Sequence, residues 1–433
     1  MFVSKQSIGT IAALVVAPLI WAGPAAAQNF ASCVNSLKSA AVRAGVSQSV
    51  VNQALNITQP DEKVLRLSGV QPEFKTPIWD YLGFLVDEQR VRDGQAMMRK
   101  YDSVLRAAEQ RFGVNRFVIA AVWGVETDFG REAGDNFLPH ALATLTCASG
   151  KRTDFWRQQL IAALKLVSSG DLKLDELYGS WAGAFGQTQF IPTTYQSLAV
   201  DFDGDGRRDL VKSVADALGS TANYLRRGGW QPGGSWMIEV KVPASYKGPT
   251  GRTNRASLSS WASRGVVRAD GSGLSGGAQA GLLLPAGPRG PGFLVFKNFD
   301  AIYSYNRAES YALAISYLAD RMAGYPPLRT PWPTDDPGLS RAERLHLQKL
   351  LLARGYDIGE ADGKIGPITR AAIAEAEKKA GMPPTGRAGS KIYRALGGNP
   401  ASAAMATGSA PSVGLGSSGT DGSVPVPPAK PMR

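Results

Sequence analysis

Residues 120–130 read AAVWGVETDFG, in which an apolar run ends at the carboxylate of Glu126. Apolar side chains recur at helical spacing over residues 115–125, which predicts a buried helix with Glu126 at its end. Burial disfavours a charged carboxylate, raises its pKa and suits it to act as a general acid. Asp128 cannot share that helix face, because residues two apart point in different directions. A helix-terminal glutamate in a salt bridge explains this motif equally well.

Residues 179–195 read GSWAGAFGQTQFIPTTY, a glycine-rich stretch that carries several polar side chains. Small residues let a backbone approach a ligand closely. Ser180, Gln187 and Gln189 offer hydroxyl and amide groups suited to the hydroxyl and N-acetyl groups of sugars. An ordinary glycine-rich turn into a helix after Pro192 is the alternative for this stretch on its own.

Helical spacing of apolar residues recurs on both sides of these two stretches. The predicted helices lie within 31–44, 47–55, 89–112, 155–167, 214–225 and 310–322. Between 230 and 299, short β-rich pieces such as 236–240 and 293–296 lie among glycines and prolines and predict a few strands. The sequence therefore predicts one mainly α domain over residues 28–326 with a small β insertion.

The remaining C-terminal part divides into three segments. Five prolines between residues 325 and 338 predict a stiff linker over 327–338. Residues 339–396 form a compact helical segment. Residues 397–433 are mostly Gly, Ser, Ala and Pro, so they cannot bury enough surface to offset the entropy of ordering, and we expect a disordered tail.

The composition is that of a basic globular protein. Of the 433 residues, 44% are hydrophobic and 19% charged, and the net charge is +12. Such a surplus indicates an acidic partner, which could be nucleic acid, anionic lipid or an acidic cell-wall polymer. Lysine and arginine are spread along the chain, and the chain begins like an exported protein, so we expect no nucleic-acid partner.

Residues 1–27 have the pattern of an export signal, with a positive start, an apolar run over 8–21 and small residues before a cleavage point after Ala27. A membrane anchor is the alternative, but the run is short and contains Pro18, and no later segment could span a bilayer. Lipoprotein processing at Cys33 is a further alternative, disfavoured because polar residues separate Cys33 from the apolar run. We expect a mature protein outside the cytoplasm.

Cys33 and Cys147 are the only cysteines in the sequence. Exported compartments are oxidising, so the two are predicted to form a disulfide. Two separately buried thiols are the alternative.

Taken together, WGVETDFG (123–130) and GSWAGAFGQTQFIPTTY (179–195) closely resemble the lytic murein transglycosylase B family. The stretch NFDAIYSYNRAESYALAISYLADRMAG (298–324) adds to the resemblance, which covers residues 30–325. It implies a lysozyme-like, mainly α fold and cleavage of the MurNAc–GlcNAc β-1,4 bond that leaves a 1,6-anhydro-MurNAc end. It assigns the catalytic acid/base to Glu126. The implied groove positions are Ser180, Gln189, Tyr224, Tyr305 and Tyr311.

A single carboxylate agrees with such a reaction. Hydrolysing glycosidases normally use two carboxylates. When the substrate's own C6 hydroxyl attacks C1, one glutamate can protonate the leaving oxygen and then deprotonate that hydroxyl, and no cofactor is required. The N-acetyl group of the substrate would stabilise the cationic centre, oriented by Gln189 and Ser180. The tyrosines suit stacking on sugar faces, although aromatic residues on helices more often belong to the core.

Residues 201–209 read DFDGDGRRD, with carboxylates at alternate positions before a glycine turn, as at the start of an EF-hand loop. The candidate ligands are the side chains of Asp201, Asp203 and Asp205 and the backbone carbonyl of Arg207. Lys212 replaces the usual glutamate at the twelfth position, and in the resembling family a later carboxylate completes the loop, for which Asp216 is the match. We expect a structural Ca²⁺, with an ion-free acidic turn as the alternative.

Residues 340–396 resemble the three-helix peptidoglycan-binding domain type 1, carried by GYD (355–357) and ADGKIG (361–366). The aromatic–glutamine pair usual in its third helix is here Ala376–Glu377, which lowers the expected affinity for the wall. His140 and His346 have no other potential metal ligands near them in the sequence and are interpreted as structural or solvated.

The sequence thus predicts a periplasmic, monomeric lytic transglycosylase with a wall-binding module. Its expected partners are peptidoglycan glycan strands and other cell-wall enzymes. A muramidase that admits water to the same bond is one alternative, and a reducing product end instead of an anhydro end would identify it. A non-catalytic peptidoglycan-binding scaffold is the other, against which the intact motif around Glu126 argues.

Overall fold

A computed structural model describes residues 24–68 and 76–399 of the chain. Residues 1–23 of the predicted export signal and 400–433 of the predicted tail lie outside the described residues. The last residues of the predicted signal begin helix α1 (Pro24–Arg43). Over the described ranges, no helix combines the length and apolar character needed to cross a membrane.

The first group of helices surrounds a core built from Leu138, Leu142, Leu160 and Tyr195, all fully buried. Its helices are α1, α2 (Gln48–Ala54), α3 (Glu62–Leu67), α9 (Leu138–Ala148), α10 (Thr153–Ser168) and α11 (Pro192–Leu198). A disulfide between Cys33 on α1 and Cys147 on α9, with Cα atoms 5.8 Å apart, ties two distant segments of this group together.

The second group of helices packs around α8 and α15, which lie against each other. Its helices are α5 (Ile78–Leu85), α6 (Glu88–Lys100), α7 (Asp102–Phe112), α8 (Arg116–Thr127), α12 (Val214–Arg227), α14 (Lys297–Asn306) and α15 (Glu309–Met322). The continuous helical spacing over 89–112 is interrupted in the structure, because Tyr101 leaves helical geometry between α6 and α7. The predicted mainly α fold is confirmed.

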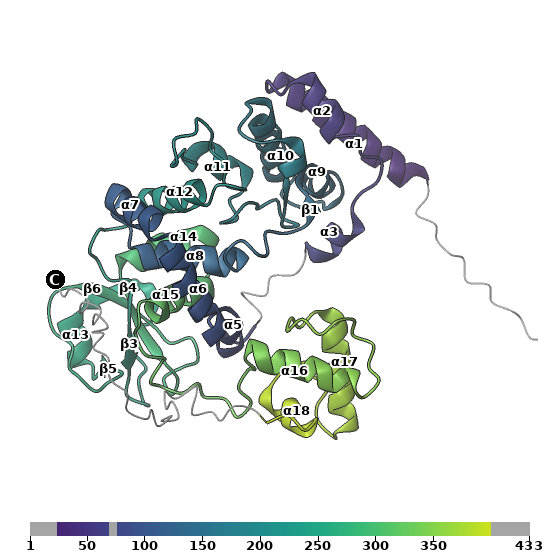
Figure 1. Cartoon of the computed structure of the whole chain (residues 1–433). Helices are drawn as coiled ribbons and strands as arrows, with labels where there is room; N and C mark the ends of the chain where they lie inside the picture. The colour runs from purple at the N-terminus through teal and green to yellow at the C-terminus, as the bar shows by residue number, and fades with distance from the viewer. Residues whose placement is uncertain (1–23, 69–75, 400–433) are drawn as a thin grey trace, which may run out of the picture.

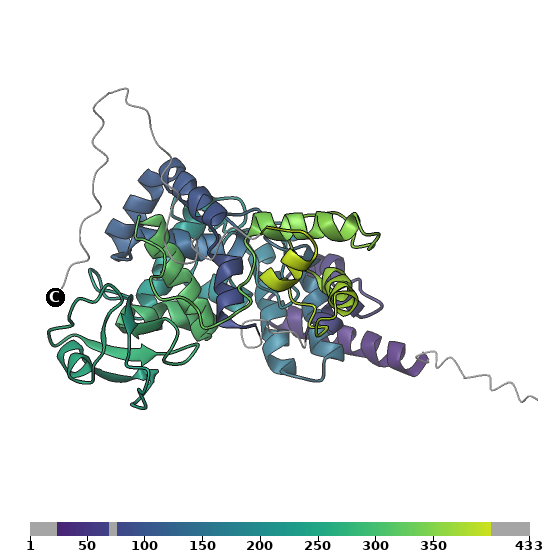
Figure 2. The ribbon, with the colours of Figure 1, turned by 90° about the horizontal axis from the view of Figure 1, so that it is seen from below.

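A five-stranded antiparallel sheet forms the insertion between α12 and α14. Its strands are β3 (Met237–Lys241), β4 (Gly251–Ser257), β5 (Val267–Arg268), β6 (Gln279–Leu283) and β7 (Gly292–Val295), in the order β4-β6-β7-β3-β5. Trp261 on α13 (Leu258–Ser263) is fully buried beside the sheet and donates its indole N–H to the carbonyl of Ala280 at 2.8 Å. The sheet lies at one end of the molecule and α1 at the other (Figures 1 and 2).

The C-terminal module has three helices, α16 (Arg341–Leu352), α17 (Pro367–Lys379) and α18 (Ser390–Ala395), around its own core. It lies beside α5 (Figure 1). Ala376 and Glu377 lie on α17, the second helix of the module and not the third. Glu377 is buried and accepts hydrogen bonds from the Thr385 hydroxyl and the Gly386 amide, both at 2.7 Å. Ala376 and Glu377 are therefore buried residues that stabilise the interior of the module.

The predicted linker over 327–338 is not free of the first domain. Leu328 and Thr330 are each only 9% exposed. The backbone amides of Arg329 and Thr330 donate to the carboxylate of Glu239 on β3, at 2.9 and 2.8 Å. The start of this segment is thus fixed along the sheet.

Candidate active site

Glu126 lies in the last turn of α8, where a buried helix reaches the edge of the core. Residues 118–124 of α8 are all buried. Gly124 lets the chain fold back on itself, because a Cβ there would stand 2.6 Å from the Phe129 ring. The helix ends at Asp128, whose left-handed backbone (φ 50°) turns the chain away. The local sequence thus presents Glu126 on the rim of a packed helix.

Glu126 is partly exposed, but protein atoms pack densely around its carboxyl group. The hydroxyl of Tyr311 on α15 donates a hydrogen bond to its Oε1. Burial raises the pKa of Glu126 to about 7, opposed by the Tyr311 hydrogen bond, which lowers it. Near neutral pH this group can both donate and accept a proton, as a general acid/base must.

Three of the predicted groove residues come together as a row of tyrosine rings. Tyr305 on α14 lies between Tyr311, whose ring centroid is 6.3 Å away and nearly parallel, and Tyr224 on α12, at 4.6 Å. The Tyr305 hydroxyl donates to the carbonyl of Thr188 at 2.7 Å, and the Tyr224 hydroxyl to that of Ser304 at 2.8 Å. Burial raises the pKa of Tyr305 and of Tyr311, so both phenols stay protonated and act as donors.

The glycine-rich stretch 179–195 forms a compact set of turns beside Glu126. It begins in the short strand β2 (Tyr178–Gly179), which pairs with β1 (Asn136–Phe137). The hydroxyl of Ser180 accepts the amide of Ala184 at 3.0 Å. Gln189 has a left-handed backbone (φ 52°), and its Nε2 donates to the carbonyls of Ala133 and Gly186 at 3.0 and 3.1 Å. Both predicted groove residues therefore also hold the turn.

Gln187, a candidate sugar ligand in the sequence, has a structural role. Its Oε1 accepts the indole N–H of Trp123 at 3.0 Å, and its Nε2 donates to the carbonyl of Val211 at 3.0 Å. Its backbone carbonyl accepts the hydroxyl of Thr127, the residue after Glu126, at 2.6 Å. A Cβ at Gly130 would stand 2.3 Å from Gln187 Oε1. These bonds fasten the glycine-rich stretch to the end of α8.

Sequence reasoning missed the charged network beneath Glu126. Asp128 is 4% exposed, and its Oδ1 accepts Nε of the buried Arg90 at 3.0 Å. Although burial alone would raise it, Arg90 and Arg341 hold the pKa of Asp128 below its usual value. Asp128 is thus an ionised structural carboxylate and no second catalytic acid. Arg90 and Arg341 lie on distant segments, and no local sequence pattern indicates that they pair with Asp128.

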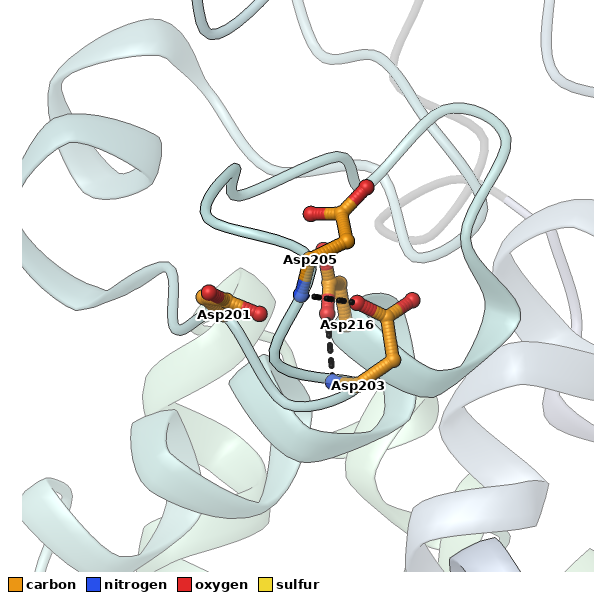
Figure 3. A group of neighbouring side chains, drawn as sticks. All are labelled: Asp201, Asp203, Asp205 and Asp216. Carbon is orange, nitrogen blue, oxygen red and sulfur yellow. Dashed lines mark hydrogen bonds between the residues drawn. The ribbon is translucent and has the colours of Figure 1, made fainter.

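The three aspartates of the acidic loop and Asp216, which the family resemblance had added, lie together, with ligand oxygens of Asp201, Asp203, Asp205 and Asp216 all within 4.8 Å of one another (Figure 3). Asp216 is fully buried on α12 and accepts the amides of Phe202 and Asp209, both at 2.7 Å. Burial raises the pKa of Asp216.

Arg207 and Lys212 of the acidic loop each pair with a nearby carboxylate. The backbone amide of Arg207 donates to Asp205 at 2.8 Å, and its guanidinium lies 3.6 Å from the same carboxylate. Lys212, at the twelfth position, forms an ion pair with Glu176. Three loop acids and one helix acid are therefore within reach of one cation, and oxygen donors of this kind fit a Ca²⁺ ion.

Two surface cavities lie away from Glu126. One, of about 550 Å³, is lined by Lys165, Asp171 and Arg208 among others, and another, of about 660 Å³, by Arg255 and Lys297. Neither includes Glu126, so the candidate site is identified by its side-chain chemistry.

The transglycosylase SLT domain matches residues 29–320, and the putative peptidoglycan binding domain matches residues 340–396. The chain belongs to the SLT transglycosylase family. Within that family it is a peptidoglycan lytic transglycosylase with an added binding domain.

Three similar proteins have related sequences or structures. Membrane-bound lytic murein transglycosylase B of Escherichia coli (strain K12) is 32% identical over 287 residues, 64% of this chain and 77% of that protein. SltB3 from Pseudomonas aeruginosa, solved in complex with NAG-anhNAM-pentapeptide, is 42% identical with a TM-score of 0.68, over 85% of this chain and 99% of that one. Escherichia coli Slt35, solved in complex with calcium, is 30% identical with a TM-score of 0.58, over 70% and 93%.

Proposed function

We propose that this lytic transglycosylase cleaves the MurNAc–GlcNAc β-1,4 bond of peptidoglycan and leaves 1,6-anhydro-MurNAc ends, with Glu126 as its one acid/base. The observation that carries the proposal is the position of Glu126 at the end of the buried helix α8, where Tyr311 donates a hydrogen bond to its carboxyl group and burial raises its pKa to about 7. Among the described residues, no other carboxylate contributes to that pKa. SltB3, a related enzyme, was solved with an anhydro-muramyl fragment, which supports the product assignment.

The first step uses protonated Glu126. Its carboxyl proton passes to the glycosidic oxygen as the bond from C1 to that oxygen breaks, so the GlcNAc leaves as a neutral alcohol. The positive charge that develops at C1 is met by the carbonyl oxygen of the substrate's N-acetyl group. Ser180 and Gln189 lie on the turn fastened to α8 and would orient this group.

The second step uses the carboxylate left by the first. Glu126 takes the proton of the C6 hydroxyl while that oxygen bonds to C1, which forms the anhydro ring and returns Glu126 to its starting state. The proton is conserved over the cycle, and no water is consumed. Tyr311 keeps its hydrogen bond to Oε1 throughout, so it fixes the direction in which the carboxyl group faces.

The tyrosine row would form the wall of the groove. Tyr224 and Tyr305 already donate their hydroxyls to backbone carbonyls, so their expected contribution to a glycan is the ring face. Tyr311 is 3% exposed, and its main partner is Glu126.

Digestion of purified sacculi followed by mass spectrometry of the muropeptides tests the reaction. Anhydro ends are expected. Reducing ends would identify a muramidase, and no release of fragments would identify a binding scaffold.

We propose further that the acidic loop holds a structural Ca²⁺ ion through Asp201, Asp203, Asp205 and Asp216, with the carbonyl of Arg207 as an added ligand. Four carboxylates within 4.8 Å repel one another, which a divalent cation would offset. The related Slt35 was solved with calcium. The ion would stabilise the loop before α12, which carries Tyr224, and would take no part in the chemistry.

The proposed location is the periplasm, after removal of residues 1–27. The Cys33–Cys147 disulfide supports an oxidising compartment. A lipid on Cys33 would need the sulfur that this bond uses, which argues against lipoprotein anchoring. Mass determination of the mature N-terminus tests both points. The C-terminal module is proposed to bind peptidoglycan, as its family match suggests.

A further inference from the structure

The first helix of the C-terminal module contacts the end of the catalytic helix. Arg341 begins α16, and its Nη1 lies 3.3 Å from Oδ2 of Asp128, the residue that ends α8 two positions after Glu126. Its Nε lies 3.6 Å from Oδ2 of Asp87. Both carboxylate side chains are 4% exposed. A module residue thus faces two buried acids of the transglycosylase domain.

Arg341 faces a buried carboxylate oxygen of Asp87. Asp87 caps the N-terminus of α6, and its Oδ1 accepts the amide of Arg90 at 2.9 Å. Its other oxygen, Oδ2, is buried and has no hydrogen-bond donor among the residues that the structure describes. A buried carboxylate oxygen without compensation is unfavourable. Arg341 supplies the positive charge opposite that oxygen.

Asp128 accepts hydrogen bonds from arginines of both domains. Oδ1 accepts Nε of Arg90, which also donates to the carbonyl of Leu85 at 3.1 Å. Oδ2 accepts Nε of Arg131 at 3.1 Å and Nη1 of Arg341. Of these three arginine contacts with Asp128, that of Arg341 comes from the module.

The backbone here depends on such support. Asp128 and Phe129 both have left-handed conformations, with φ of 50° and 61°, which side-chain-bearing residues seldom adopt. Surrounding contacts must hold such residues in place. Because the turn directly follows Glu126 and Thr127, its relaxation would move the carboxyl group relative to Tyr311 and the glycine-rich stretch.

Other contacts keep the module in this position. Arg387 forms a two-pronged ion pair with Asp80 on α5, at 2.5 and 2.6 Å. The guanidinium of Arg344 lies 4.9 Å from the centre of the Phe84 ring. Lys364 pairs with Glu132 at 3.0 Å, but this pair is exposed on both sides. The docked arrangement therefore has several anchors, of which Arg341 alone touches the end of the catalytic helix.

We propose that Arg341 is a positioning residue for Glu126, so that the docked module is part of the catalytic unit as well as a wall-binding domain. The inference rests on the proposed role of Glu126. The module's guanidinium fixes the Asp128 turn, and the turn fixes the direction of the catalytic carboxyl group.

The test uses the full-length enzyme and a soluble glycan fragment, so that wall binding does not enter the rate. Arg341→Ala is expected to lower kcat about tenfold with little change in KM, the size typical of coupling through a packed network. The pH at which activity falls should move down, because a less confined carboxyl group regains solvent. Arg341→Lys should recover part of kcat. Lys364→Ala, which removes an exposed ion pair of the same interface, should match wild type.

A double variant separates an effect on positioning from an effect on folding. Asp87→Asn combined with Arg341→Ala removes the unpaired buried charge, so its melting temperature should exceed that of Arg341→Ala while kcat stays low. If Arg341→Ala lowers the melting temperature but leaves kcat and the pH profile unchanged, or if the double variant regains wild-type kcat, the positioning role is wrong. Glu126→Gln serves as reference: activity within tenfold of wild type there would overturn the proposed role of Glu126, whatever the Arg341 variants do.

Discussion

The hydroxyl of Tyr311 donates a hydrogen bond to the carboxyl group of Glu126, joining two residues 185 positions apart in the sequence. The bond links the end of α8 to the start of α15, the two helices at the centre of the transglycosylase domain. It meets a carboxyl group that burial already keeps partly protonated at neutral pH. The chemistry of the site depends on this pair.

Replacing Glu126 by glutamine should abolish cleavage, by roughly a thousandfold or more, because the amide cannot donate and recover a proton. Fold and sacculus binding should stay close to wild type. Release of anhydro-muropeptides measures the activity, and Glu62→Gln, an exposed acid on α3, is the matched control. Activity within tenfold of wild type would rule out Glu126 as the acid/base.

Tyr311→Phe should lower kcat/KM about tenfold, since it removes the bond that directs the carboxyl group. The Tyr311 hydrogen bond lowers the pKa of Glu126, so its loss should shift the high-pH decline of activity to higher pH. Tyr317→Phe, on the same helix but outside the site, is the control. An unchanged pH profile in Tyr311→Phe would show that the bond does not tune Glu126.

Stability should depend on pH through Glu126. Its folded-state pKa, about 7, lies above the ordinary value of 4.5. The stabilisation is therefore fully present below pH 4.5 and is lost as pH rises through 7. The loss should be on the order of 2 kcal/mol, since partial exposure screens the carboxylate. As the pH of the buffer rises from mildly acidic to mildly alkaline, the melting temperature of Glu126→Gln should increase relative to that of wild type. A constant difference would mean that the carboxyl group titrates normally.

Calcium should stabilise the acidic loop. A chelator is expected to lower the melting temperature, excess Ca²⁺ to raise it by mass action, and Mg²⁺ to substitute poorly because it demands a tighter octahedral shell. Asp203→Ala should remove this dependence and keep residual cleavage, whereas Asp175→Ala, an exposed acid outside the loop, should retain it. A wild-type melting curve that neither chelator nor millimolar Ca²⁺ moves would argue against the site.

The sequence predicted the long helices well, because their information is local. The apolar spacing of residues 115–125 and 214–225 yields α8 and α12 with small shifts at the ends. The break at Tyr101 was missed, since the apolar spacing continues through it. Strands β4 and β6 were also missed, because their sequences, GRTNRAS and QAGLL, are short and contain small or polar residues.

The site was predictable where a motif carries it and unpredictable where distant residues complete it. Glu126 and Gln189 lie inside ordered motifs. Gln187 has the same side chain as Gln189 two positions away, and only the folded structure shows that it binds Trp123. The Asp128–Arg341 contact joins residues 213 apart, and neither has a local pattern that names the other.

Because the start of the predicted linker is bound to the sheet, the transglycosylase domain can move only a short distance from a module that is bound to the wall. Residues 329 and 330 are tied to Glu239, and Gly338 pairs with Gly389 inside the module. Residues 335–337 are also bonded to the module, through Lys391, Arg387 and Ser390. Only residues 331–334 remain between the two attached segments, and that length of chain spans roughly 14 Å when fully stretched. A module that no longer contacts Asp128 through Arg341 would thus remain connected by a short linker. An enzyme whose module is bound to the wall would therefore cut only glycan strands next to the bound module.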